Sequence, residues 1–406
     1  MSKSQKHNFC TRLSVLMILF FFFSFILLAF RDQNVLGYVL SAAVPLFILM
    51  SASFFPKLFT TDALLLSITG FLLSLGVLVL YAVRPSAAMH QIYSCGVGYA
   101  GMILCMALVR AVKSWQRIIW IIIPLSFILL TIPFLFGSSS YNPADGSISS
   151  ITGEMIKIIL VIVLAYFLSR GYHIPSLLFG FVCILLLFIQ KNFDSAVLTC
   201  GTVLLLLWAS SGGFFSSLLG LTGFAALSWY GYLYLPDFQS RVAAWLKPLA
   251  DQGDSGNLIQ AIVFMSSSGL WGNGLGLTSS ASDLLYESEY LFSILCGQFG
   301  IIFAICVLLI LAAFIWRSTS ISASSRSGFY GLLSMGCTIQ LGLQTFLSIG
   351  GIFKLIPLTG ASLPFLSFDS ASLVSALCMT GLILGVENLN LEAVNEAAHL
   401  TLMRRS

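Results

Sequence analysis

The stretch Leu13–Phe30, LSVLMILFFFFSFILLAF, decides the fold class, because it runs for eighteen residues without a charged side chain. A helix needs about 20 mostly apolar residues to cross the hydrocarbon core of a bilayer. Lys3, Lys6 and Arg12 precede the stretch, as basic residues precede a secretory signal sequence. The apolar core is too long for such a signal, however, and no small-residue cleavage site follows it. We therefore expect a retained first membrane span.

The rest of the chain repeats this pattern. Of the 406 residues, 58% are hydrophobic and only 8% are charged, whereas a soluble domain carries about 25% charged residues. The apolar runs are continuous rather than alternating, which favours spanning helices over a membrane β-barrel. The sequence thus predicts an all-α polytopic membrane protein of about twelve transmembrane helices. We expect them at residues 13–30, 36–55, 63–83, 93–112, 118–137, 152–170, 176–190, 195–210, 214–234, 290–316, 328–350 and 364–386.

The distribution of lysine and arginine predicts the orientation, because cytoplasmic loops of membrane proteins are enriched in both. With the N-terminus placed in the cytoplasm, the inner segments hold twelve of these residues and the outer segments hold six. This asymmetry predicts a multi-pass protein of the bacterial inner membrane with both termini in the cytoplasm. The net charge of +4 is dispersed along the chain, so nothing indicates a nucleic-acid partner.

One outer loop, residues 235–289, stands apart from the others because of its length and its charge. A structureless loop this long is uncommon unless it is functional. The apolar run Leu258–Met265 suggests short helices that lie on the membrane, and a solvated tether is the alternative. The loop holds six of the fifteen acidic residues, Asp237, Asp251, Asp254, Asp283, Glu287 and Glu289, together with Arg241 and Lys247.

Glu154 and Lys157 open the sixth predicted span at a spacing of three residues, which places both side chains on one helix face. Ionisable groups within a span are costly, and they usually face the bundle interior or a water-filled cavity. Glu154 also lies near the helix N-terminus, where the helix dipole favours negative charge. The pair is therefore either a structural ion pair or part of a polar cavity wall near the outer face.

The segment before the last predicted span, residues 356–372, combines two prolines, a glycine and a polar cluster within apolar sequence. Non-helical backbone at membrane depth is tolerated only where it is buried in protein or lines a cavity. Ser367 or Asp369 is a candidate cap for the final helix. The alternative is a re-entrant segment that forms the floor of a cavity beneath the large loop.

Four groups of residues carry a likeness to a known family. In chain order they are Ile151–Lys157 (ITGEMIK); Arg241, Pro248, Asp251 and Gln260 with Leu270–Gly276 (LWGNGLG); Glu287–Phe292 (ESEYLF) with Gly297–Gly300 (GQFG); and Gln344, Pro357, Gly360, Leu363, Pro364 and Ser367. In order and spacing they resemble the SEDS family of polytopic cell-wall polymerases, which includes FtsW, RodA and SpoVE. The run LWGNGLG is closer to FtsW than to RodA.

The resemblance implies a domain organisation. A SEDS-like membrane domain with ten spans and the large extracytoplasmic loop 235–289 is expected over residues 62–386. Residues 1–61 then hold an N-terminal tail and two additional transmembrane helices, and residues 387–406 form a cytoplasmic C-terminal tail.

The resemblance also implies a function. SEDS polymerases join the disaccharide-pentapeptide units of lipid II, which are carried on undecaprenyl pyrophosphate, with inversion at the anomeric carbon. We therefore expect a peptidoglycan glycosyltransferase at the outer face of the inner membrane, acting in cell division or cell-shape growth. A class B penicillin-binding protein transpeptidase is the partner that the resemblance implies, with other divisome or elongasome proteins.

The candidate site follows the same likeness, with departures from the family pattern. The catalytic aspartate of the family falls at Glu289, the nearby histidine position holds Glu287, and an acidic position holds Asn192, with Asp194 two residues later. A positioned carboxylate acts as general base towards a sugar hydroxyl, and Glu289 is the first candidate and Glu287 the second. The expected substrate-binding residues are Arg241, Lys247, Glu154, Lys157, Gln260 and Ser367, and Asp251 and Asp254 are candidate ligands for Mg²⁺ or Mn²⁺.

Three alternatives remain open at this point. A lipid II flippase fits many helices around a polar cavity, although the polar sequence is concentrated on the outer side. An O-antigen-ligase-like transferase would depend on histidine in the outer loop, and this loop has none. The departures at the candidate site are also compatible with a non-catalytic scaffold that activates a penicillin-binding protein.

Overall fold

Each predicted apolar run corresponds to a helix in the computed structural model, which describes residues 3–59, 61–112, 115–136, 148–211, 214–247, 254–276, 288–325 and 327–403. No strand occurs in these ranges, so the all-α fold class is confirmed. In chain order the elements are α1 (Lys3–Asp32), α2 (Val35–Leu49), the π-helical turn η1 (Met50–Phe54), α3 (Phe55–Phe59), α4 (Ala63–Val83), α5 (Pro85–Ala111), α6 (Trp115–Phe136), α7 (Ile148–Ser169), α8 (His173–Ile189), α9 (Phe193–Ser211), α10 (Phe214–Tyr234), α11 (Pro236–Leu246), α12 (Asp254–Ser267), the 3-10 turn η3 (Ser288–Tyr290), α14 (Leu291–Ala323), α15 (Gly328–Ile352) and α16 (Ser370–Met403).

The number of helices able to cross a membrane is close to the prediction. Within the described ranges, ten helices are long and apolar enough, and α10 with α11 adds an eleventh as a pair bent by 92°. The remaining predicted span corresponds to α8, which is apolar but has only 17 residues. The chain is therefore a multi-pass membrane protein.

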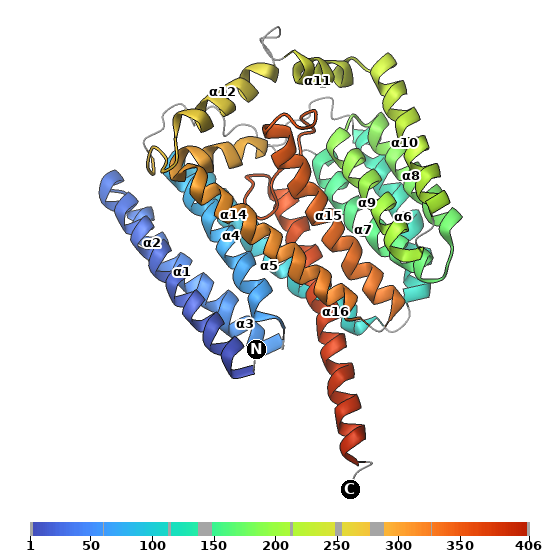
Figure 1. Ribbon diagram of the computed structural model, residues 1–406, viewed down its shortest axis with the longest axis horizontal. Helices are drawn as coiled ribbons and strands as arrows, with labels where there is room; N and C mark the ends of the chain where they lie inside the picture. Colours follow the sequence, from blue (N-terminus) through green and yellow to red (C-terminus); the bar gives the residue numbers. More distant parts are fainter. Residues whose placement is uncertain are drawn as a thin grey trace.

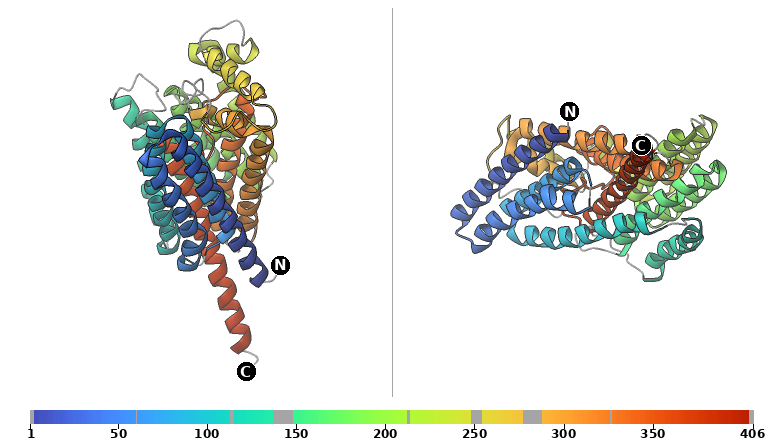
Figure 2. Two further views of the ribbon diagram at one scale, coloured as in Figure 1. Left: turned by 90° about the vertical axis from the view of Figure 1, so that its left-hand side faces the viewer. Right: turned by 90° about the horizontal axis from the view of Figure 1, so that it is seen from below.

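The helices form a bundle with a long and a short side, and the loop helices lie across one end of it (Figures 1 and 2). In the view from below, α1 and α2 lie at one end of the long side and the helices from α6 to α10 at the other. Helices α11 and α12 cover the end of the bundle that is opposite both chain termini (Figure 1). Both termini thus lie on one face, and the helices of the 235–289 loop lie on the other.

The centre of the bundle is formed by α4 and α16, which are the most buried of the candidate spans. Small residues let α16 approach α5 closely, as is typical of membrane helices. A Cβ atom at Gly381 would lie only 2.3 Å from the carbonyl oxygen of Met102, and one at Gly98 would lie 2.4 Å from the Leu377 side chain. At the terminus-bearing end, Arg317 of α14 is paired with Asp62 and with Glu387 of α16, which joins three helices.

The segment between α15 and α16 returns into the bundle without forming a helix. Residues 361–367 are buried there. Gln344 of α15 donates to the carbonyl oxygen of Ser362 at 3.0 Å, and Gln91 of α5 donates to that of Leu366 at 3.2 Å. Asp369 caps α16, since its Oδ1 accepts a hydrogen bond from the Ala371 amide at 3.0 Å. The segment is therefore both the re-entrant stretch and the source of the cap that the sequence suggested.

A turn at residues 268–276, which we call the clasp, is hydrogen-bonded to the backbone of α14. The amides of Asn273 and Gly274 donate to the carbonyl oxygens of Gly297 and Gln298 at 2.9 and 3.1 Å. Helix α14 is kinked at Gly300, where φ is 85°. A Cβ at Gly300 would lie 2.3 Å from a clasp carbonyl, so only glycine fits. The clasp thereby fixes the first segment of α14, which follows directly after η3.

Candidate functional site

A buried ion pair lies near the start of α7. Lys157 Nζ is 2.6 Å from Glu154 Oε1, and the lysine side chain has no exposed surface. Glu154 also accepts a hydrogen bond from the hydroxyl of Ser375 on α16 through its other carboxylate oxygen. The contact that the i, i+3 spacing predicts is present, and it connects α7 with the central helix α16.

A second carboxylate, Asp194, lies beside the same lysine. It is in the first turn of α9, its Oδ2 is 4.0 Å from Lys157 Nζ, and its Oδ1 accepts a hydrogen bond from Ser195 at 3.1 Å. Asp194 was expected only as a departure from the pattern of the resembled family and not as a site residue. The only indication in the sequence was that Asp194 lies two residues after position 192, at which the resemblance implies an acid.

Gly360 is the point at which side chains from three separate elements meet. A Cβ atom built on it would lie 3.5 Å from Arg241 Nη1, 3.7 Å from Glu289 Oε2 and 4.0 Å from the Cβ of Asp194. Its φ of 90° is a conformation that favours glycine. Arg241 is fixed there because it donates to the carbonyl oxygen of Leu358 at 3.3 Å. The re-entrant segment thus brings α11, η3 and α9 together.

The electrostatics of the site are set by four carboxyl groups and two cations. Glu154, Asp194, Glu289 and Asp369 supply the carboxyl groups, and Lys157 and Arg241 supply the cations. Burial, and then the charge of Glu154, raise the pKa of Asp369 to about 7, although the Ala371 amide and Lys157 act in the opposite direction. Such a cluster can bind an anionic group through its cations and accept a proton through a carboxylate.

Several predicted site residues lie elsewhere or outside the described ranges. Lys247 at the end of α11 and Gln260 on α12 are both exposed. Ser367 is fully buried in the re-entrant segment, and its hydroxyl has no hydrogen-bond partner among the described residues. Glu287 lies outside the described residues, so its candidate role stays a prediction.

The predicted cation site stays a prediction for the same reason. Asp251 lies outside the described residues, and Asp254 begins α12 with its side chain outside them. In the part of the chain that the structure describes, no three histidine, cysteine or acidic residues are grouped as metal ligands. Both candidate ligands therefore await a direct measurement.

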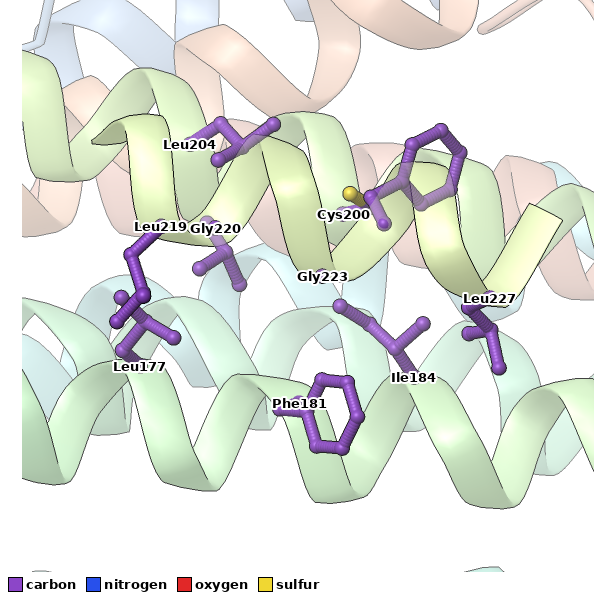
Figure 3. A pocket seen from close by; sticks show the side chains of 11 residues that line it. Leu177, Phe181, Ile184, Cys200, Leu204, Leu219, Gly220, Gly223 and Leu227 are labelled. Carbon is purple, nitrogen blue, oxygen red and sulfur yellow. The ribbon is translucent and has the colours of Figure 1, made fainter. Parts of the chain in front are cut away.

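A pocket of about 40 Å³ between α8, α9 and α10 differs in kind from this polar site (Figure 3). Phe181 and Ile184 of α8 face Cys200 of α9 and Leu227 of α10, and Gly220 and Gly223 leave space on α10. All of its lining side chains are apolar or small. The pocket is lined by no charged side chain, so the candidate site remains the cluster around Gly360.

Comparison with known proteins gives consistent results. The family model for cell cycle proteins of the FtsW, RodA and SpoVE type matches residues 56–391. Stage V sporulation protein E of Bacillus subtilis is 27% identical over 358 residues, which cover 80% of this chain and 96% of that protein. Peptidoglycan glycosyltransferase RodA of Mycobacterium tuberculosis is 23% identical over 354 residues, which cover 78% of this chain and 75% of that protein.

The similarity extends to solved structures. A chain from a peptidoglycan synthase complex, described as coordinating polymerization and crosslinking, has a TM-score of 0.65 at 19% sequence identity. The match covers 81% of this chain and 98% of that one. At this identity the likeness shows a shared fold. The expected closer relation to FtsW than to RodA stays a prediction.

Proposed function

This chain belongs to the FtsW, RodA and SpoVE family of cell cycle proteins, and on that premise we propose that it is a peptidoglycan glycosyltransferase that polymerises lipid II. The observation that carries the proposal is the meeting of Glu289, Arg241 and Asp194 around Gly360. A carboxylate and a guanidinium that both lie close to one backbone position are the groups that a sugar transfer from a pyrophosphate requires.

In the proposed reaction Glu289 is the general base. The 4-hydroxyl oxygen of the acceptor sugar forms a bond to the anomeric carbon of the growing glycan, and the hydroxyl proton passes to the Glu289 carboxylate. The bond between that carbon and the lipid pyrophosphate breaks, the electron pair leaves with the pyrophosphate, and the configuration inverts. A positioned base of this kind contributes a rate factor of about 10²–10⁴.

Arg241 is the proposed contact for the leaving pyrophosphate, because a guanidinium binds phosphate oxygens through two parallel hydrogen bonds. Lys157 adds positive charge from within the bundle, where Glu154 and Asp194 hold it. Mg²⁺ or Mn²⁺ bound by Asp251 and Asp254 is a further proposed component, since both ions prefer oxygen ligands. Polymerisation that is unchanged in EDTA would remove the ion from the proposal.

We place the site at the outer face of the bacterial inner membrane, with both termini in the cytoplasm. The lysine and arginine distribution supports this orientation, as does the position of α11 and α12 at the end opposite both termini. A class B penicillin-binding protein is the proposed partner, within the division or elongation machinery. Its support is the similarity to a chain from a peptidoglycan synthase complex.

The test is polymerisation of labelled lipid II by purified protein, with and without the penicillin-binding partner. Glu289→Gln keeps the shape of the side chain and removes the base, so we expect the rate of glycan formation to fall about 10²–10⁴-fold. Glu396→Gln is the matched control, because Glu396 is exposed on the projecting end of α16. A Glu289→Gln protein that polymerises at the wild-type rate contradicts the assigned role.

The same preparation distinguishes polymerisation from transport. Liposomes that carry labelled lipid II in one leaflet report its appearance in the other leaflet, while gel analysis reports glycan strands. Strands formed without translocation support the glycosyltransferase. Translocation without strands would support the flippase instead, and strands formed only by an added partner would indicate a scaffold.

A further inference from the structure

Two helices that lie outside the family-matched residues reach the outer loop. Helices α1 and α2 precede residue 56, at which the family match begins. They form a hairpin at one edge of the bundle, beside α4 (Figures 1 and 2). The upper end of this hairpin lies near the clasp, the turn of residues 268–276 that fixes the start of α14.

Arg31, at the outer end of α1, is in direct contact with the clasp. Its Nη1 donates to the carbonyl oxygen of Leu275 at 2.9 Å. A Cβ at Gly276 would lie 1.6 Å from the same nitrogen, so the guanidinium lies against the bare glycine backbone. Asp32 holds the other edge of the guanidinium, since Arg31 Nε is 2.6 Å from Asp32 Oδ1. The side chain is therefore held at both edges.

Phe20, about three turns before Arg31 on α1, packs across the kink of α14. Its ring is stacked on that of Phe303, with centroids 6.1 Å apart, and lies 6.4 Å from that of Phe299. Phe299 and Phe303 are themselves stacked at 4.5 Å, one on each side of Gly300. The contact thus covers the position at which the clasp interrupts the helix.

We propose that the α1–α2 hairpin holds the clasp and the α14 kink and thereby positions the candidate base Glu289, with Arg31 and Phe20 as positioning residues. The inference rests on the proposed function. Arg31 holds the clasp, the clasp is bonded to the carbonyl oxygens of Gly297 and Gln298, and these belong to the helical segment that follows Glu289 directly.

The physical reason for a positioning contact from outside is the glycine content of this region. Positive-φ glycines recur in the clasp and at the α14 kink, and glycine leaves the backbone more conformational freedom than other residues. A displacement of about 1 Å at a reacting group is enough to lower a rate about 100-fold. A hydrogen bond and an aromatic stack from outside the segment restrict this freedom.

The experiment combines hydrogen exchange with steady-state kinetics on the full-length protein. Arg31→Ala and Phe20→Ala remove the two contacts, and Arg31→Lys retains a cationic donor. Arg117→Ala on α6 and Phe23→Ala on the exposed side of α1 are the matched controls. Mass spectrometry measures amide exchange in peptides that contain residues 268–276, and lipid II polymerisation gives kcat and KM separately.

We expect Arg31→Ala and Phe20→Ala to accelerate exchange in the clasp and to lower kcat about tenfold, with KM little changed, because the base rather than the binding groups is displaced. Arg31→Lys should recover part of both effects. Either control variant should match the wild type in exchange and in kcat.

Two results would overturn the inference. If the clasp in Arg31→Ala exchanges as it does in Arg117→Ala, the hairpin does not hold the clasp. If exchange rises but kcat does not fall, the clasp does not position the base. A wild-type protein that forms no glycan removes the proposed function and the positioning role together, whereas the exchange difference then still decides whether the hairpin holds the clasp.

Discussion

Replacing Lys157 with methionine removes a cation from between the buried Glu154 and the partly buried Asp194 while keeping most of the side-chain volume. Its Nζ is 2.6 Å from Glu154 Oε1 and 4.0 Å from Asp194 Oδ2. At an effective dielectric constant of about 20, these separations correspond to gross attractions of about 6 and about 4 kcal/mol. Much of this only offsets the cost of burial, and removing one partner of a buried pair typically costs about 3–5 kcal/mol.

We therefore expect Lys157→Met to lower the free energy of unfolding by about 3–5 kcal/mol, measured by SDS titration in mixed micelles. Lys57→Met is the matched control, because Lys57 is exposed on α3, and its effect should stay within about 0.5 kcal/mol. Adding Glu154→Gln to Lys157→Met should cost less than the sum of the two single effects, with a coupling of about 0.5–3 kcal/mol.

Two outcomes would refute this reasoning. A loss for Lys157→Met no larger than that for Lys57→Met would mean that the buried carboxylates do not depend on the lysine. Strict additivity of the two substitutions would mean that the 2.6 Å contact contributes nothing of its own.

Three further predictions test the surroundings of the site. Gly360→Ala forces an L side chain into a φ of 90°, so we expect a loss of about 1 kcal/mol or more in unfolding free energy, with slower polymerisation. A Cβ at Gly297 would lie 1.8 Å from the Phe264 ring, so Gly297→Ala should destabilise by about 1–3 kcal/mol, and Phe264→Ala should relieve it in the same micelle assay. The raised pKa of Asp369, about 7 against an ordinary 3.8, means that the native state retains its proton longer. The unfolding free energy should therefore fall as pH rises across that interval, and Asp369→Asn should flatten the decline.

The positions of the helices could be predicted because apolar runs mark the parts of the chain that lie in hydrocarbon. The run 63–83 coincides with α4 (Ala63–Val83). Helix α16 shows the limit of the method, since the predicted span 364–386 differs from Ser370–Met403 at both ends. Hydropathy marks apolar residues and not the ends of a helix, so the predicted span includes the buried re-entrant residues before Ser370. It also misses the polar end of the helix that projects beyond the bundle (Figure 1).

The clasp and the kink in α14 could not be predicted in the same way. The run that became α14 is mostly apolar, and its GQFG sequence does not by itself specify a kink, because the conformation of Gly300 depends on hydrogen bonds with residues 269–274. The sequence analysis identified the glycine-containing run Leu270–Gly276 as a motif. It gave no indication of the backbone against which those glycines pack.

Contacts within the site were predictable from local geometry only where the residues share one helix. Glu154 and Lys157 are three residues apart, so helical geometry alone places them in contact. Arg241 and Glu289 meet at Gly360 because α11, η3 and the re-entrant segment converge, and no local pattern specifies that convergence. For the same reason the exposure of Lys247 and Gln260 could not be foreseen, since the orientation of a short loop helix depends on the elements beneath it.

Asp194 lies beside the buried Lys157, although the resemblance implies the acid at position 192. The chain turns at Lys191, where φ is 61°, and α9 begins at Phe193, so Asn192 and Asp194 both lie where α9 faces α7. The Asn192 amide lies 2.4 Å from where a Cβ of Gly153 would be, and Asp194 reaches Lys157. The acid expected at 192 is thus absent, yet the buried lysine still has a second carboxylate. Because the attraction between two charges depends on their separation, Asp194 interacts with Lys157 at 4.0 Å without an acid at position 192.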